Sequence, residues 1–179
     1  MRFMAVLLLG LVCAAAVLAP LLTPHSPAQR FDDRAYAPPA PIHVVDVEGR
    51  WRAPFVYPMN LVDRLERRYE EDRTRLVTLA WFSEGALVRQ VDETAGPWLL
   101  LGGDSLGRDV FARVLHGARL SLAVAVVAML GALVLGALLG GLAGVSGGLV
   151  DDGLMRLADF VLVLPAMYVV LALRASLPL

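Results

Sequence analysis

Three long stretches of the 179-residue chain are apolar, and one polar segment separates the first from the other two. The first stretch, residues 3–22, carries no charged side chain over 20 residues. At about 1.5 Å per residue, a helix of that length is about 30 Å long, which matches the hydrocarbon core of a bilayer. A cleaved signal peptide is the alternative, but its apolar region is usually only about 7–15 residues long. The pattern therefore predicts an N-terminal transmembrane helix within residues 1–22.

The second stretch, residues 120–145, carries no charged side chain over 26 residues, which the cores of soluble proteins rarely contain. It predicts a second transmembrane helix. Small residues recur in it at every fourth position and include Gly136, Gly140 and Gly144. In lipid, small residues let two helix backbones approach closely, so we expect these three glycines to pack against other helices.

The third stretch runs from about residue 154 to residue 173 and contains Arg156, Asp159 and Pro165. Arg156 and Asp159 are three residues apart, so a helix would place them side by side on one face. Charges deep in lipid are costly, and both residues fall in the first two turns, which predicts a pair at the membrane interface. A proton relay is the alternative role for such a pair. Pro165 predicts a kink.

Residues 146–153 form a short, glycine-containing turn between the second and third stretches. Asp151 or Asp152 is placed to cap the next helix and to complement its dipole. Because the connection is so short, residues 120–173 are predicted to form an antiparallel helix hairpin in the membrane.

Residues 23–101 contain most of the polar side chains and predict a small, mixed, partly ordered module. Its first part is rich in proline, which is typical of an extended linker. The later patterns predict a strand, a short helix and a hairpin whose turn is Ser83-Glu84-Gly85. In order, these elements are the linker at 23–41, the strand at 42–47, the helix at 60–72 and the hairpin strands at 76–82 and 86–91.

Residues 102–119 begin with a glycine-rich turn, after which apolar residues recur at helical spacing. The pattern predicts an amphipathic helix at the interface that leads directly into the second transmembrane helix. Asp109 and Arg113 are four residues apart, so we expect them to form an ion pair on that helix.

The composition supports a membrane protein. Of all residues, 58% are hydrophobic and 18% are charged, and the mean hydropathy is +0.64. These values exclude a disordered or purely soluble chain. The net charge of −1 provides no field for nucleic acid, and the single cysteine excludes an internal disulfide. The fold class predicted is an all-α integral membrane protein, in which the mixed module lies between the first and second of three transmembrane helices.

Two motifs suggest catalysis, but neither is complete. Residues 103–106 resemble the nucleophile block of the GDSL esterases, yet the only histidine after Ser105 is His116, with no aspartate three residues before it. Residues 102–109 resemble a P-loop, but Arg108 and Asp109 replace its lysine and its Ser/Thr. All 16 basic residues are arginine, which also excludes enzymes that need a catalytic lysine. We therefore expect no catalytic, cofactor-binding or metal-binding residues.

From residue 101 onward, the chain resembles the inner-membrane permeases of binding-protein-dependent ABC importers of the dipeptide, oligopeptide and nickel type. These permeases carry L-G-T-D-x-x-G-R-D-V-x-x-R before their second helix and then G-A-R-x-S-L; here Gly103 replaces the threonine. Later they show spaced glycines and G-G-x-x-D-x-x-x-M-R-x-x-D, which ends in this chain at Asp159. The resemblance covers residues 101–173 well and the first helix loosely, and residues 23–100 look like an insertion. The main motif residues are Gly102, Asp104, Gly107, Arg108, Asp109, Arg113, Gly117 and Arg119.

The resemblance implies a permease subunit of the bacterial inner membrane that does no chemistry itself. Its N-terminus would be cytoplasmic and residues 23–118 periplasmic. Its partners would be a second permease, ABC ATPase subunits and a periplasmic substrate-binding protein, besides membrane lipid. Peptides or similar small solutes would be the cargo, with no substrate-contacting residue assigned.

Members of this family usually continue with further helices and a cytoplasmic E-A-A-x-x-x-G loop. We therefore expect this chain to be an incomplete permease, the N-terminal half, with residues 174–179 as its shortened end. A small non-transport membrane protein, whose outer module binds partners, is the alternative.

Overall fold

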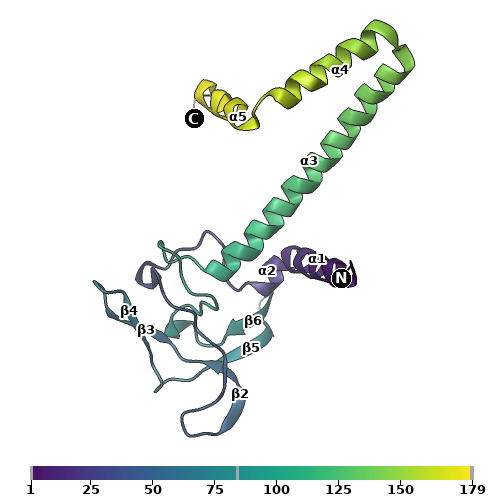
Figure 1. The fold of residues 1–179 in the computed structure, drawn as a ribbon. Helices are drawn as coiled ribbons and strands as arrows, with labels where there is room; N and C mark the ends of the chain where they lie inside the picture. The colour runs from purple at the N-terminus through teal and green to yellow at the C-terminus, as the bar shows by residue number, and fades with distance from the viewer. Residues whose placement is uncertain (1, 84, 178–179) are drawn as a thin grey trace. The chain divides into compact units, whose positions relative to one another are not determined.

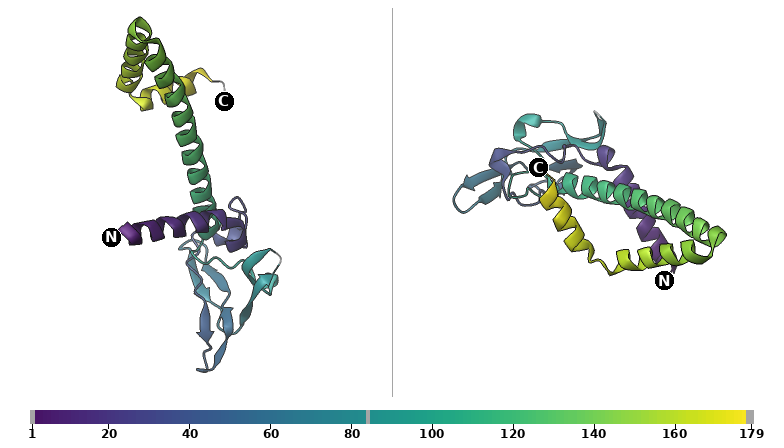
Figure 2. Two further views of the ribbon diagram at one scale, coloured as in Figure 1. Left: turned by 90° about the vertical axis from the view of Figure 1, so that its right-hand side faces the viewer. Right: turned by 90° about the horizontal axis from the view of Figure 1, so that it is seen from above.

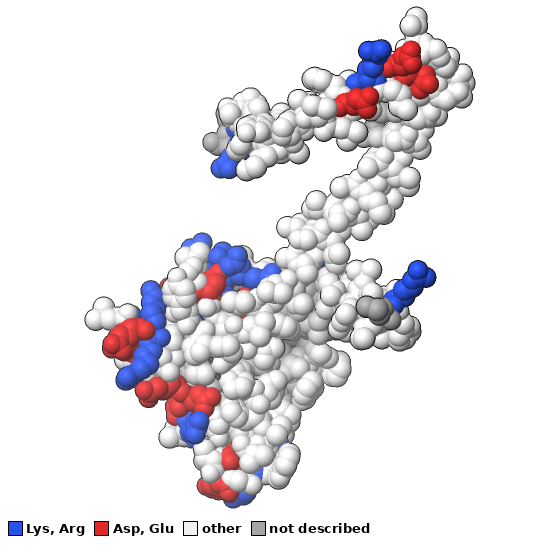
Figure 3. Space-filling view, in the orientation of Figure 1, with Lys and Arg blue, Asp and Glu red and all other residues white. Residues whose placement is uncertain are grey.

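The computed structural model describes residues 2–83 and 85–177, and the chain forms two compact units, Met1–Val124 and Ala125–Leu179 (Figure 1). The first unit contains the N-terminal helices, the strands and the start of a long helix. The second contains the rest of that helix and two further helices. On the face shown in Figure 3, charged side chains gather over β3 and β4 and at the β1–β2 end of the sheet, whereas the long helix is uncharged along most of its length.

The N-terminal apolar stretch forms two helices, α1 (Arg2–Val17) and α2 (Ala19–Leu22). The structure thus corrects the single helix predicted through residues 3–22. Pro20 explains the division, because its ring clashes with the carbonyl group four residues earlier and it has no N–H to donate. α1 has 16 residues and is about 24 Å long, shorter than a typical hydrocarbon core of about 30 Å.

The polar segment is built from antiparallel strands. A four-stranded sheet has the order β1-β2-β5-β6, and β3 and β4 form a separate hairpin. The predicted strand at 42–47 and the paired strands predicted at 76–82 and 86–91 are confirmed, whereas Glu84 of the predicted turn lies outside the described residues. The bounds are His43–Val45 for β1, Trp51–Val56 for β2, Met59–Asp63 for β3, Arg68–Glu71 for β4, Val77–Ser83 for β5 and Ala86–Gln90 for β6.

The helix predicted at residues 60–72 is wrong, because β3 and β4 occupy these positions. The carboxylate of Asp63 accepts hydrogen bonds from the backbone amides of Leu65 and Glu66, which closes a turn there. Arg67 then has a φ of +54°, a left-handed conformation that ends any helix. The side chain of Leu65, which the helical pattern would bury, is 96% exposed.

A small apolar core holds the sheet to the segments on either side of it. Val56, Val77 and Leu79 from the strands pack against Ala40 and Trp98. The indole Nε1 of Trp98 donates a hydrogen bond to the carbonyl oxygen of Ala40 at 3.0 Å. A short 3-10 helix, η2 (Glu93–Ala95), leads from β6 toward this tryptophan.

Residues 31–40, called the strap below, run along the module (residues 23–109) and contain the 3-10 helix η1 (Asp32–Arg34). Three alanines of the strap, Ala35, Ala37 and Ala40, are buried. The strap is therefore fixed by packing, although its proline content alone predicts a free extended linker.

The second apolar stretch lies within α3 (Val110–Ser146), a helix of 37 residues that both views of Figure 2 show as uninterrupted. At about 1.5 Å per residue, it is about 55 Å long. The amphipathic residues after Val110 and the apolar run 120–145 thus share one helix, and residues 102–109 are not helical. Among the described helices, α3 alone is long and apolar enough to cross a membrane as a single helix.

α4 (Gly148–Val163) and α5 (Ala166–Ser176) are bent by 83° at Pro165 and together also have the length and composition of a membrane span. The bend confirms the effect expected of Pro165. The capping prediction is wrong: Gly147, with a φ of +57°, is the N-cap of α4 and forms no side-chain cap hydrogen bond. Asp151 instead lies inside the first turn of α4, where its charge complements the helix dipole.

Candidate functional site

A loop of residues 102–109 connects the module to α3 and lies against the strap. Gly102 and Gly107 have φ angles of +80° and +68°, which favour glycine. A Cβ atom on Gly102 would overlap the carbonyl oxygen of Ala37, and one on Gly107 would overlap that of Phe31. These positions require glycine because the backbone of the strap already occupies the space.

Backbone hydrogen bonds join the strap to this loop. The amide of Gly103 donates to Ala37 O at 2.9 Å, that of Phe31 to Gly107 O at 3.1 Å, and that of Tyr36 to Asp104 O at 3.0 Å. The loop and the strap therefore form one unit in which main-chain atoms supply most of the contacts.

Asp104 organises the polar side of the loop. Its Oδ1 accepts hydrogen bonds from the backbone amides of Leu106 at 2.8 Å and Arg108 at 2.9 Å. Its Oδ2 accepts one from Arg108 Nε at 2.8 Å and is also bound by the guanidinium of Arg113. Burial raises the pKa of the Asp104 carboxyl, but the hydrogen bonds from Arg108 and Leu106 lower this pKa by a larger amount. The net pKa therefore lies well below its usual value.

Asp109 is the N-cap of α3 and is 1% exposed. Its Oδ1 accepts hydrogen bonds from the backbone amides of Phe111 at 2.9 Å and Ala112 at 3.3 Å. Its Oδ2 lies 3.0 Å from Nδ1 of His25, which comes from the segment after α2. The ion pair expected between Asp109 and Arg113 is therefore wrong, because capping turns the Asp109 carboxylate inward while Arg113 binds Asp104.

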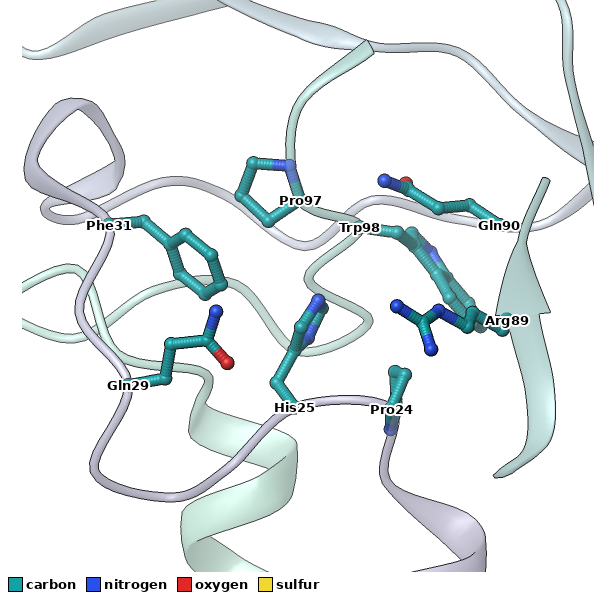
Figure 4. Close-up of a pocket in the computed structure, with 8 residues that line it drawn as sticks. All are labelled: Pro24, His25, Gln29, Phe31, Arg89, Gln90, Pro97 and Trp98. Carbon is teal, nitrogen blue, oxygen red and sulfur yellow. The ribbon is translucent and has the colours of Figure 1, made fainter. Parts of the chain in front are cut away.

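His25 is a site residue that the sequence did not indicate. Its ring contacts Phe31 edge-on, with 5.2 Å between the ring centroids. Both rings line a cavity of about 180 Å³ in the module, and Figure 4 shows His25 between Phe31 and Trp98. The other lining residues are Pro24, Gln29, Arg89, Gln90 and Pro97.

The remaining predicted site residues lie outside this cluster. Gly117 and Arg119 lie in the exposed part of α3, and Arg156 and Asp159 are exposed on α4. Within the described parts of the chain, the structure contains no group of three or more His, Cys, Asp or Glu side chains that could hold a metal ion.

The second unit contains an apolar groove of about 490 Å³ between α3 and α4. Gly136 and Gly140 line it from α3, and a Cβ atom on either would meet no atom within 4 Å. Gly144 has the same open surroundings. The groove is completed by Leu139 and Ala143 from α3 and by Leu154, Met155, Leu157, Ala158, Val161 and Leu162 from α4.

Part of the chain matches curated transport proteins. The di/tripeptide transport system permease protein DppC of Pseudomonas aeruginosa is 39% identical over 108 residues, 60% of this chain and 33% of the relative. The oligopeptide transport system permease protein OppC of Bacillus subtilis is 39% identical over 77 residues, 43% of this chain and 25% of the relative. The nickel transport system permease protein NikC of Escherichia coli is 42% identical over 77 residues, 43% of this chain and 27% of the relative.

The chain spans about a third or less of the length of these curated relatives. No family model matches it. No solved structure matches it either. The resemblance seen in the motifs is nevertheless confirmed by these relatives. Over 40–60% of its length, at about 40% identity, this chain is homologous to permease subunits of binding-protein-dependent ABC importers.

Proposed function

We propose that the chain is a permease subunit of an ABC importer and forms part of the membrane path for peptides or similar small solutes. The observation that carries this proposal is the 39% identity to a di/tripeptide permease over 108 residues. The length and apolar surface of α3 fit the same role, since a permease must cross the bilayer.

The proposed topology places three spans in the bacterial inner membrane: α1 with α2, α3, and the bent pair α4 and α5. The N-terminus is cytoplasmic and residues 23–118 are periplasmic. The joint length and apolar composition of α4 and α5 support treating them as one broken span, and a bend is tolerated in a membrane where neighbouring helices satisfy the freed backbone groups. Such neighbours would come from partner subunits.

Labelling of a single cysteine tests this topology. In a Cys13→Ser background, Leu65→Cys places a thiol at a position of the β3–β4 turn that is 96% exposed. We expect an impermeant thiol reagent applied outside the inner membrane to label it in intact spheroplasts. Labelling only after lysis would reverse the assignment, and Ser146→Cys, at the opposite end of α3, provides the reciprocal control.

The proposed partners are a second permease, ABC ATPase subunits and a periplasmic substrate-binding protein. The roles proposed for the subunits fit the composition of this chain. It contains no lysine, so it lacks the P-loop residue that binds nucleotide phosphates. ATP hydrolysis is therefore assigned to the partners and solute passage to the permeases.

We propose that a helix of the partner permease packs into the groove between α3 and α4. Its glycines leave open space, and in lipid close backbone packing holds helices together. Gly140→Leu would fill this space. We expect it to reduce recovery of the second permease during affinity purification about tenfold, the change produced by about 1.4 kcal/mol.

Gly131→Leu is the matched control for that variant. Gly131 is nine residues earlier, which at about 100° per residue puts it on the opposite face of α3, and its Cβ would also meet no atom within 4 Å. Equal recovery of the second permease with both variants would contradict the assigned face. If the unaltered chain, expressed with its whole operon, is recovered without permease or ATPase partners, the alternative of a non-transport membrane protein is favoured.

A further inference from the structure

The β5–β6 hairpin exposes two neighbouring aromatic side chains. Trp81 is 54% exposed and Phe82 is 76% exposed, although both belong to the paired strand β5. Phe82 has a φ of +53°, a left-handed conformation that a bulky residue rarely adopts. A strained, exposed phenylalanine beside an exposed tryptophan is costly in water, which suggests that something other than water covers it.

This hairpin lies beside the points where the chain leaves the module for its apolar helices. β6 is the edge strand of the sheet, and it packs against α2, the continuation of α1. An apolar cavity of about 150 Å³ is lined jointly by Leu22 of α2, Leu87 and Val88 of β6, and Phe111 of α3. The hairpin is therefore adjacent to the end of the N-terminal helix and to the first turn of α3.

The other exposed tryptophan of the sheet provides a contrast. Trp51 is 82% exposed at the start of β2. In Figure 1 and in the left view of Figure 2, the β1–β2 connection lies at the end of the module away from α2. On the face shown in Figure 3, charged side chains gather at that connection and over β3 and β4, whereas the surface below α2 is uncharged.

We infer that the β5–β6 hairpin rests on the periplasmic leaflet of the bilayer, with Trp81 and Phe82 in the lipid headgroup region. Tryptophan is enriched at this depth because its apolar ring and its N–H suit the two sides of the interface. Lipid is favoured over a protein partner because the proposed span of α1 and α2 brings the bilayer surface close to β6, which packs against α2. The inference rests on the proposed membrane insertion of these helices.

Quenching of tryptophan fluorescence by lipids with brominated acyl chains tests the inference. The chain has three tryptophans, and the buried Trp98 is common to both variants. In proteoliposomes, Trp51→Phe, which keeps Trp81, should retain most of the quenching, whereas Trp81→Phe, which keeps Trp51, should lose most of it. Aqueous iodide should give the reverse order. Equal bromolipid quenching of the two variants would overturn the inference.

Phe82→Gly tests whether the strain at this position serves membrane contact. Glycine adopts the left-handed conformation without strain, so the variant should melt at a higher temperature in detergent. It should also lower the bromolipid quenching of Trp81 because an anchoring side chain is lost. A variant whose quenching is unchanged would contradict a role for Phe82 in lipid contact.

Alkaline carbonate extraction separates this inference from the proposed function. If the chain is extracted from the proteoliposomes, the membrane span itself is refuted. If the chain stays in the pellet while Trp81 is quenched by iodide and not by bromolipid, only the hairpin placement is refuted. Protection of Trp81 from both quenchers would indicate a protein contact, such as a second copy of the chain, and would also refute it.

Discussion

Replacing Asp109 by alanine should lower the stability of the module by about 2–5 kcal/mol, since losing an N-cap costs about 0.5–2 kcal/mol and losing a hydrogen bond to a charged group about 1.5–3 kcal/mol. The variant loses the cap on the Phe111 and Ala112 amides and leaves His25 beside an apolar surface. Thermal unfolding in detergent, followed through the fluorescence of the buried Trp98, measures the loss.

Asp109→Asn separates the two contributions. Asparagine caps helices about as well as aspartate but lacks the charge that faces His25, so this variant should fall between the wild type and Asp109→Ala. Asp33→Asn is the control, since its carboxylate is 72% exposed and pairs with the exposed Arg64, a contact worth about 0–1 kcal/mol. If Asp109→Ala and Asp33→Asn melt alike, the capping role assigned to Asp109 is wrong.

Gly107→Ala should cost about 2–4 kcal/mol, because it adds left-handed strain and forces the strap away from the loop. The new methyl group would overlap the carbonyl oxygen of Phe31, a main-chain atom that cannot rotate away. The measured quantities are the melting temperature in detergent and the rate of proteolysis within the strap.

Gly117→Ala is the matched control, since Gly117 belongs to the same sequence motif but lies within α3. A Cβ atom there would meet nothing within 4 Å, and alanine favours a helix over glycine by about 1 kcal/mol. We therefore expect Gly117→Ala to be neutral or stabilising. If Gly117→Ala destabilises the protein as much as Gly107→Ala, the loss of stability at Gly107 cannot be assigned to its contact with the strap.

The long apolar run was sufficient to predict the membrane-crossing part of α3, and the residue pattern of the polar segment was sufficient to predict β1, β5 and β6. This pattern failed at residues 60–72, where Leu61, Leu65 and Tyr69 fit a helical stripe. There the contacts of one side chain outweighed periodicity, since the Asp63 carboxylate binds two following amides and closes a turn. Pro20 likewise divided a stretch whose hydropathy is continuous.

Sequence analysis predicted only those residues of the candidate site that are neighbours in the sequence. The loop residues from Gly102 to Arg113 stand together in the sequence, so their motif was visible. The contact of Asp109 with His25 joins residues 84 positions apart, and neither hydrophobic periodicity nor spacing relates such positions. The strap was also missed, because it meets the loop through carbonyl oxygens, which every residue carries.

The same carbonyl contacts have a consequence for how this region can diverge between related proteins. Phe31 and Ala37 present main-chain oxygens to Gly107 and Gly102, and any L-residue would present the same atoms. The constraint on substitution therefore falls on the loop and not on the strap. Exposed residues of the strap can be substituted freely, whereas the two facing glycines have no acceptable substitute. Divergent relatives should accordingly retain the glycine pattern opposite a strap of unrelated sequence, and alignment by strap residues would fail even where the two backbones superimpose.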